Sequence, residues 1–210
     1  MIISVFGASG RTGHAFVRVA AEAGHLQRLH YRNKPSEMTP DTATVVVGAL
    51  TDPTAVREVM RGSDAVVVLL GPRPDARGLF TAAATKAIIA GMRTQEVSRL
   101  LCVTGAMIGA RPDNVGLTMK LMAFVQRKTD MVDMLKDRDE QERLVRNSKL
   151  QWTVIKPPKL TDGDAGPYKA GASVSVGLGS HLSRAALAKF LLAEIELPQY
   201  ATSAVYVKDT

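Results

Sequence analysis

Three closely spaced glycines near the N-terminus constrain the fold of this chain more than any other feature. The segment MIISVFGASGRTGHAF has them at Gly7, Gly10 and Gly13, directly after an apolar, β-favouring run and directly before a helical pattern. Such a strand–loop–helix unit allows a tight turn and brings backbone N–H groups close to a phosphate, which the helix dipole also favours. Because no GxxxxGK[ST] loop is present, we expect a dinucleotide rather than a nucleoside triphosphate.

Short apolar segments alternate with longer helical patterns along the chain. Helical stretches are predicted at 11–23, 53–61 and 74–92, and strand-like runs at 2–6, 27–31, 43–47, 65–70, 98–103 and 152–156. Apolar strands separated by helices are typical of a parallel sheet covered on both faces. We therefore expect an α/β, Rossmann-like, doubly wound fold with a mostly parallel sheet and helices on both faces.

Local signals predict where the later helices begin and end. Ser183 is expected to cap a last helix, and Gly91 to end an earlier helix near Ala90. The stretch 117–147 is long for one helix and could be two, with a break near Asp137.

The domain prediction is one NAD(P)-binding unit over residues 1–210. Within it, 157–182 is rich in Gly, Pro, Ser and Asp and has one strand-like piece at 172–176, while 203–208 offers another strand. A late irregular segment in such a chain is where a small substrate-side lobe is expected.

The end of the second predicted strand indicates which dinucleotide is bound. An NAD site usually has an Asp or Glu about 20 residues after the glycines, which accepts from the ribose 2′-OH. Here LQRLHYRNKPS has no acid but three basic residues, Arg28, Arg32 and Lys34. A guanidinium suits a 2′-phosphate, and Arg11 in the glycine loop is a second candidate for it. We therefore predict NADP(H) over NAD(H), with Arg32 at the 2′-phosphate.

The composition is that of a soluble globular protein, with 46% apolar and 22% charged residues. No apolar run approaches the roughly 20 residues that a membrane span needs, so no membrane partner is expected. The chain starts directly in a strand-like run without a secretory signal pattern, and its one cysteine, Cys102, is expected to be a buried thiol. These features predict a cytoplasmic protein.

Charge and histidine content argue against two further classes of site. The net charge is +7, but the basic residues are scattered and aromatics are only 5%, so nucleic acid is not an expected partner. His14, His25, His30 and His181 show no ligand spacing and are predicted surface or capping residues, so no metal is expected.

Several longer motifs carry a family resemblance over nearly the whole chain. They are GASGRTG, NK after the second strand, DAVVVLLGPRPD, EQERLVRNSKLQWTVIKPPKL and the SR start of the last helix. With them the chain resembles the atypical short-chain dehydrogenase/reductases, in particular the NmrA-like proteins and the biliverdin-IXβ reductase (flavin reductase) type.

The resemblance implies a set of residues around the cofactor and the substrate. The glycine loop would hold the pyrophosphate and nearby ribose, the ends of later strands would line the cofactor and face the nicotinamide, and Lys159 would border the substrate. The cofactor set is Gly7, Ser9, Gly10, Arg11, Thr12, Gly13, Arg32, Ala49, Leu50, Leu70, Gly71, Arg73, Thr104, Gly105, Pro157 and Pro158.

One segment departs from the family. After the third strand the family often has Gly-Asp, with the Asp near the adenine, whereas this chain reads GALTD. Ala49 and Leu50 would therefore offer only backbone and apolar contact there.

The usual acid–base pair of the larger superfamily is missing. That superfamily uses Tyr-x-x-x-Lys, in which the lysine lowers the tyrosine pKa for proton transfer, but none of the four tyrosines here has a lysine four residues later. Thr104 is a candidate proton donor or substrate orienter, with a strand-end hydroxyl bonded to backbone as the alternative. Lys120 and Lys159 are further candidates.

These observations lead to two hypotheses about function. The first is an NADP(H)-dependent oxidoreductase that reduces a flavin, quinone or similar conjugated small molecule, for which solvent can supply the proton. The alternative is a non-catalytic NADP(H)-sensing regulator of the NmrA-like type. Either would be a monomer or a homodimer.

Overall fold

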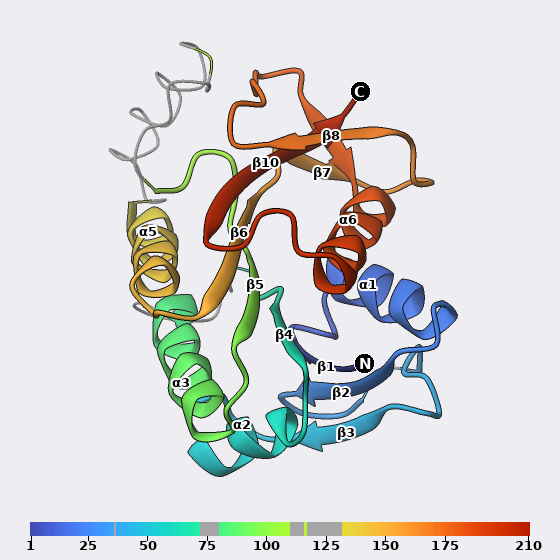
Figure 1. The fold of residues 1–210 in the computed structure, drawn as a ribbon, viewed down its shortest axis with the longest axis vertical. Coiled ribbons are helices and arrows are strands. Elements are labelled where there is room, and N and C mark those ends of the chain that lie inside the picture. The colour runs from blue at the N-terminus through green and yellow to red at the C-terminus, as the bar shows by residue number, and fades with distance from the viewer. Residues whose placement is uncertain (36, 72–79, 110–115, 117–131) are drawn as a thin grey trace.

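A computed structural model describes residues 1–35, 37–71, 80–109, 116 and 132–210, and the expected α/β architecture is confirmed (Figure 1). Eight strands form one sheet in the order β3-β2-β1-β4-β5-β6-β10-β8, parallel except for the antiparallel pair β10–β8. A separate ladder joins β7 and β9 in parallel. The strands are β1 (Ile2–Phe6), β2 (Leu26–Tyr31), β3 (Thr44–Val47), β4 (Ala65–Val68), β5 (Arg99–Val103), β6 (Gln151–Lys156), β7 (Lys159–Thr161), β8 (Tyr168–Gly171), β9 (His181–Ser183) and β10 (Ser203–Asp209).

Helices cover both faces of the sheet. Figure 1 shows α1 and α6 side by side on one face and α2, α3 and α5 along the other. Side chains that alternate along β1 supply both cores: Val5 packs toward α1 and α6, and Phe6 toward α2 and α3. The helices are α1 (Arg11–Glu22), α2 (Pro53–Met60), α3 (Phe80–Thr94), α5 (Val132–Arg146) and α6 (Arg184–Glu196). No described helix is long and apolar enough to span a membrane.

Most predicted elements lie within two residues of the observed ones. Ser183 caps α6, since its hydroxyl accepts from the Ala186 N–H, and Cys102 is fully buried in β5, where burial raises the pKa of its thiol to about 12. The residues 74–79 and 117–131 of the predicted helical stretches lie outside the described residues.

Three local predictions are wrong. The strand expected at 172–176 lies at Tyr168–Gly171, because the chain turns there, with the Val174 N–H bonded to the Gly171 carbonyl. Gly91 does not end α3. It lies inside that helix, where a Cβ would meet the Met60 side chain of α2, so glycine allows the two helices to approach.

The expected break near Asp137 is also absent, since α5 runs unbroken through it. Asp137 is buried, and its carboxylate accepts from the Thr81 N–H, the Thr81 hydroxyl and the Ala82 N–H at distances of 2.6–2.9 Å. This acid therefore satisfies the free N–H groups at the start of α3 instead of interrupting its own helix.

The strand order fixes where a ligand can bind. The chain runs outward from β1 through β2 to β3 and then returns to β4 on the other side of β1. The connections after β1 and β4 therefore diverge at the carboxyl ends of these strands. In doubly wound sheets this point is the usual ligand crevice.

Candidate functional site

The glycine loop follows β1 and is held by contacts that leave no room for side chains. Gly7 has a φ of +97°, and a Cβ on it would lie 2.8 Å from the Leu69 carbonyl carbon after β4. A Cβ on Gly13 would lie 2.6 Å from the Ala8 oxygen and closer still to the Gly7 oxygen. The first and third glycines are thus required by the approach of α1 and β4 to the loop.

Gly10 has no such packing requirement. It has an ordinary φ of −79°, and a Cβ on it would only touch the Gly7 oxygen at 3.4 Å. Gly10 is the N-cap of α1 and provides no side-chain acceptor to the N–H groups that open this helix. The backbone around it lines the space beyond the loop, so the absent side chain leaves those N–H groups open to a phosphate. The residues present fit a nucleotide pyrophosphate.

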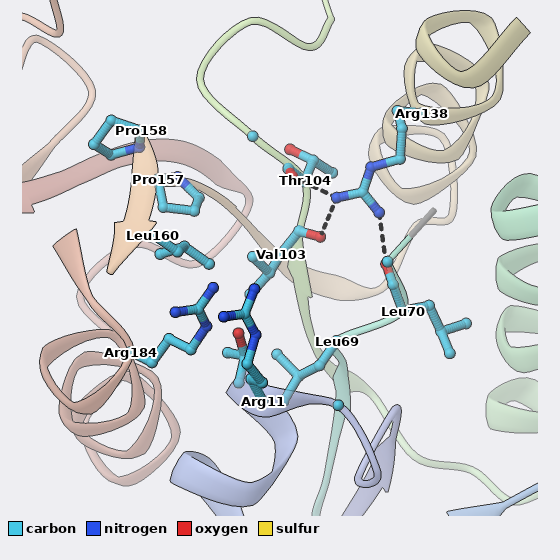
Figure 2. A pocket seen from close by; sticks show the side chains of 14 residues that line it. Arg11, Leu69, Leu70, Val103, Thr104, Arg138, Pro157, Pro158, Leu160 and Arg184 are labelled. Atoms are coloured by element: carbon cyan, nitrogen blue, oxygen red, sulfur yellow. Dashed lines mark hydrogen bonds between the residues drawn. The ribbon is translucent and has the colours of Figure 1, made fainter. Parts of the chain in front are cut away.

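Two adjoining cavities lie at the carboxyl ends of the strands and share Gly10, Leu69, Leu70 and Gly71. We call them the β2 cavity, of about 610 Å³, and the β5 cavity, of about 520 Å³. The β2 cavity is further lined by Gly7, Ser9, His30, Arg32, Ala49, Leu50, Thr51 and Phe80. The β5 cavity is further lined by Arg11, Thr12, Val103, Thr104, Gly105, Arg138, Pro157, Pro158, Leu160 and Arg184 (Figure 2). Each is the size of a typical small-molecule pocket, about 300–1,000 Å³.

The two cavities bring together most of the residues singled out in the sequence. Of the predicted cofactor set, Gly13 lies buried beneath the loop and Arg73 lies outside the described residues. Lys120, a candidate for catalysis, also lies outside them. Lys159 is exposed on β7 and lines neither cavity as described; its neighbour Leu160 and Arg184 of α6 line the β5 cavity instead.

The β2 cavity has a basic end. Of the three basic residues after the glycine loop, Arg28 donates to the Glu58 carboxylate and carbonyl of α2, whereas Arg32 lines the cavity. None of the described residues lining this cavity is acidic.

His30 also lines the β2 cavity, and its predicted position at the surface is wrong. Only 4% of it is exposed; its ring stacks on Phe6 at 5.5 Å, and its Nε2 lies 2.9 Å from the Gly48 oxygen. Burial lowers its pKa, which favours the neutral ring beside the cavity. The sequence signal was its position inside an apolar strand.

Thr104 follows β5 and lies at the wall of the β5 cavity. Its hydroxyl donates to Oε2 of Glu142 at 3.3 Å, rather than to backbone. Glu142 is itself buried and forms ion pairs with Lys156 at 3.0 Å and Arg146 at 2.7 Å. The single hydroxyl proton of Thr104 thus has an internal carboxylate acceptor, so toward the cavity the Thr104 oxygen offers lone pairs.

A tyrosine and a lysine do meet in this protein, but away from the cavities. The Lys156 ammonium lies 5.6 Å from the ring centre of Tyr206. Both residues are buried, and neither lines a described cavity. Burial raises the pKa of Tyr206 and lowers that of Lys156, while Glu142 opposes the latter shift. A raised tyrosine pKa is the reverse of what proton transfer near neutral pH requires.

Arg138 is a cavity residue that the sequence reasoning missed. It is 7% exposed, and its guanidinium donates to the backbone oxygens of Leu70, Val103 and Thr104 (Figure 2). It also donates to the Gln141 side chain. It lies within the charged run LKDRDEQERLVR, which resembles a solvated helix surface. No spacing in the sequence distinguished it from its neighbours.

The comparison with protein families agrees with this geometry. Residues 7–198 match the model of a family described as NAD(P)H-binding, which covers the glycine loop and both cavities. The chain belongs to this NAD(P)H-binding family. The prediction that the chain binds a nicotinamide dinucleotide is confirmed by this match. Among the described residues, no cluster of His, Cys, Asp and Glu could hold a metal ion.

Three relatives illustrate the range of this fold. The uncharacterized protein YwnB of Bacillus subtilis is 27% identical over 207 residues, which is 95% of this chain and 94% of YwnB. A wide-type short-chain dehydrogenase/reductase of Veillonella parvula, solved in complex with NADP, has a TM-score of 0.79 at 14% identity over 98% of this chain and 93% of its own. The anaerobilin reductase ChuY of Escherichia coli O157:H7 has a TM-score of 0.80 at 15% identity over 99% and 96%. At these identities the two structural likenesses concern the fold.

The glycine loop yields a prediction that separates folding from NAD(P)H binding. Gly13→Ala should lower the free energy of unfolding by about 3 kcal/mol or more, the upper range of overpacking, because its Cβ would meet backbone atoms. Gly10→Ala should cost at most about 1 kcal/mol of stability but weaken NADPH binding about tenfold or more, since its methyl group enters the phosphate space. Urea denaturation and cofactor titration of both variants test this. Equal NADPH affinity of Gly10→Ala and wild type would contradict the assignment of the loop.

Proposed function

We propose that this protein is an NADP(H)-dependent reductase of small, conjugated acceptors such as flavins or quinones. The observation that carries the proposal is the continuous site: a basic, acid-free β2 cavity joins, at the glycine loop, a β5 cavity without a proton donor of the Tyr–Lys kind among its described lining. The two joined cavities, with the glycine loop between them and Arg32 at one end, suit an extended dinucleotide whose 2′-phosphate lies at Arg32. The Veillonella parvula enzyme bound to NADP and the reductase ChuY share this fold.

Different residues along the site would bind different parts of the cofactor. Gly10, Arg11 and Thr12 would hold the pyrophosphate at the start of α1, and Arg32 the 2′-phosphate. Ala49 and Leu50 would line the adenosine end with backbone and apolar atoms. These contacts would hold the cofactor independently of the acceptor.

At the other end, Thr104, Gly105, Pro157 and Pro158 would surround the nicotinamide. Thr104, whose hydroxyl donates to Glu142, would accept a hydrogen bond from a group bound in the cavity and so orient it. When bound, NADPH supplies a hydride and becomes NADP⁺. An acceptor that takes up this hydride and one proton from water is reduced by two electrons. Such acceptors need little help from a protein acid, which agrees with the lining of the β5 cavity.

Turnover is the direct test of the proposal. NADPH oxidation, followed by its nicotinamide absorbance, should depend on enzyme and on a flavin or quinone, and should be slower with NADH. Binding of NADPH without oxidation by any flavin, quinone or linear tetrapyrrole would instead support a non-catalytic NADP(H)-sensing regulator.

Arg32→Ala tests the choice of cofactor. Loss of a charge-assisted contact to the 2′-phosphate should raise the Kd of NADPH about 10- to 100-fold, while the Kd of NADH changes little. Lys34→Ala is the matched control, because Lys34 is a nearby exposed cation that lines neither cavity. An unchanged NADPH affinity in Arg32→Ala, measured by calorimetry, would rule out this role.

Thr104→Val tests whether the protein supplies the proton. Because Thr104 donates to Glu142 and only accepts a hydrogen bond from a bound group, the isosteric variant should lower kcat/KM about 3- to 10-fold, whereas loss of a true acid costs about 10²- to 10⁴-fold. The pH profile of kcat/KM should also stay unchanged. A hundredfold loss with a displaced pH profile would make Thr104 the proton donor after all.

A further inference from the structure

The β5 cavity is unusually basic for a pocket that must receive an organic acceptor. Three arginines line it, Arg11, Arg138 and Arg184, and none of its described lining residues is acidic. Arg138 is already bonded to three backbone oxygens and to Gln141. The positive charge that a ligand can still reach therefore comes from Arg11 and Arg184.

Arg11 and Arg184 share one carboxylate. Nη1 of Arg184 lies 2.6 Å from Oδ1 of Asp162, and Nη1 of Arg11 lies 3.2 Å from Oδ2 of the same residue. Figure 2 shows the two guanidinium groups next to each other below Leu160. Two guanidinium groups on the two oxygens of one carboxylate form the arrangement with which proteins bind carboxylates and phosphates.

The three partners differ in exposure, and this difference indicates which of them is replaceable. The side chains of Asp162 and Arg11 are 68% and 74% exposed, whereas that of Arg184 is only 12% exposed. An ion pair with so exposed a carboxylate contributes little, so an incoming anion can take the place of Asp162. Arg184 stays in the cavity wall whichever anion it holds.

The location of Arg184 in the fold also indicates a role in binding an anion, because an arginine at this position does not stabilise the helix. It is the first residue of α6, directly after the Ser183 cap, and no acid lies in the first turn. A cation at this end of a helix is disfavoured by the helix dipole, while a bound anion is favoured. A ligand anion between Arg184 and this helix end would relieve that conflict.

Arg184 lies on the acceptor side of the site. It comes from α6, after the β7–β9 ladder, and it shares the β5 cavity with Thr104, Pro157 and Leu160. The pyrophosphate of the cofactor has its own partners at the start of α1, on the glycine loop. We propose that Arg184 anchors an anionic group, carboxylate or phosphate, of the acceptor itself, so that the substrates are anionic conjugated molecules. This inference rests on the proposed function, and Asp162 is the internal counter-ion that the acceptor displaces.

Binding to the NADP⁺-loaded protein tests the anchor independently of turnover. Two matched pairs differ only in an anionic group: FMN with riboflavin, and 1,4-naphthoquinone-2-sulfonate with 1,4-naphthoquinone. The anionic member of at least one pair should bind about tenfold or more tightly. Arg184→Met should abolish that preference, Arg184→Lys should restore part of it, and the neutral members should bind as before. Lys189→Met, which removes an exposed charge from the same helix, is the control and should have no effect.

Asp162→Asn separates competition from a structural role, because the two predict opposite changes in the affinity for the anionic probe. If Asp162 competes with the acceptor, this variant should tighten binding of the anionic member about two- to fivefold; if it only holds Arg184 in place, binding should weaken. Weakening, an absent preference in the wild type, binding of no probe, or an equal loss for both members of each pair in Arg184→Met overturns the anchor.

A raised NADP⁺ Kd in Arg184→Met also overturns it, since that result would move Arg184 to the cofactor pyrophosphate. The failure of the proposed function looks different: probes would bind with the expected preference, but NADPH would not be oxidised.

Discussion

The carboxyl ends of β4 and β5 depend on one buried guanidinium, that of Arg138. Beyond the last pair of the β4–β5 ladder, Val68 with Cys102, the carbonyl oxygens of Leu70, Val103 and Thr104 all accept hydrogen bonds from Arg138. Buried carbonyl groups without donors are costly. A single side chain of α5 thus holds Leu70, which lines both cavities, and Val103 and Thr104, which line the β5 cavity.

The residues next to Arg138 on α5 extend this role. Asp137 holds the start of α3, and Glu142 holds Lys156 at the end of β6 and accepts a hydrogen bond from the Thr104 hydroxyl. Three buried charged residues of one helix therefore position α3, β5 and β6 around the site. The charges lie close enough to compensate one another, which buried ionic groups require.

The sequence was sufficient for the features that depend on local geometry. The strand, glycine loop and helix of residues 2–22, the cap at Ser183 and the basic end of β2 follow from neighbouring residues, and they lie where expected. Arg138 could not be recognised, because its partners are backbone oxygens far away in the chain, which leave no trace in residue type. Gly91 was misread for the same reason: only the packing of α2 against α3 shows why it lacks a side chain.

The two halves of the site are built from different kinds of contact. Around Gly7 and Gly13 the chain approaches itself backbone to backbone, and almost any added atom collides with it. In the β5 cavity, side chains from β7 and the start of α6 form part of the wall, and among the described strands β8 pairs with β10 at the sheet edge. The exposed residues in the connections on either side of β8 can therefore vary while the parallel strands keep their register. This makes the fold well suited to laboratory evolution, in which those connections are varied around an unaltered NAD(P)H-binding half.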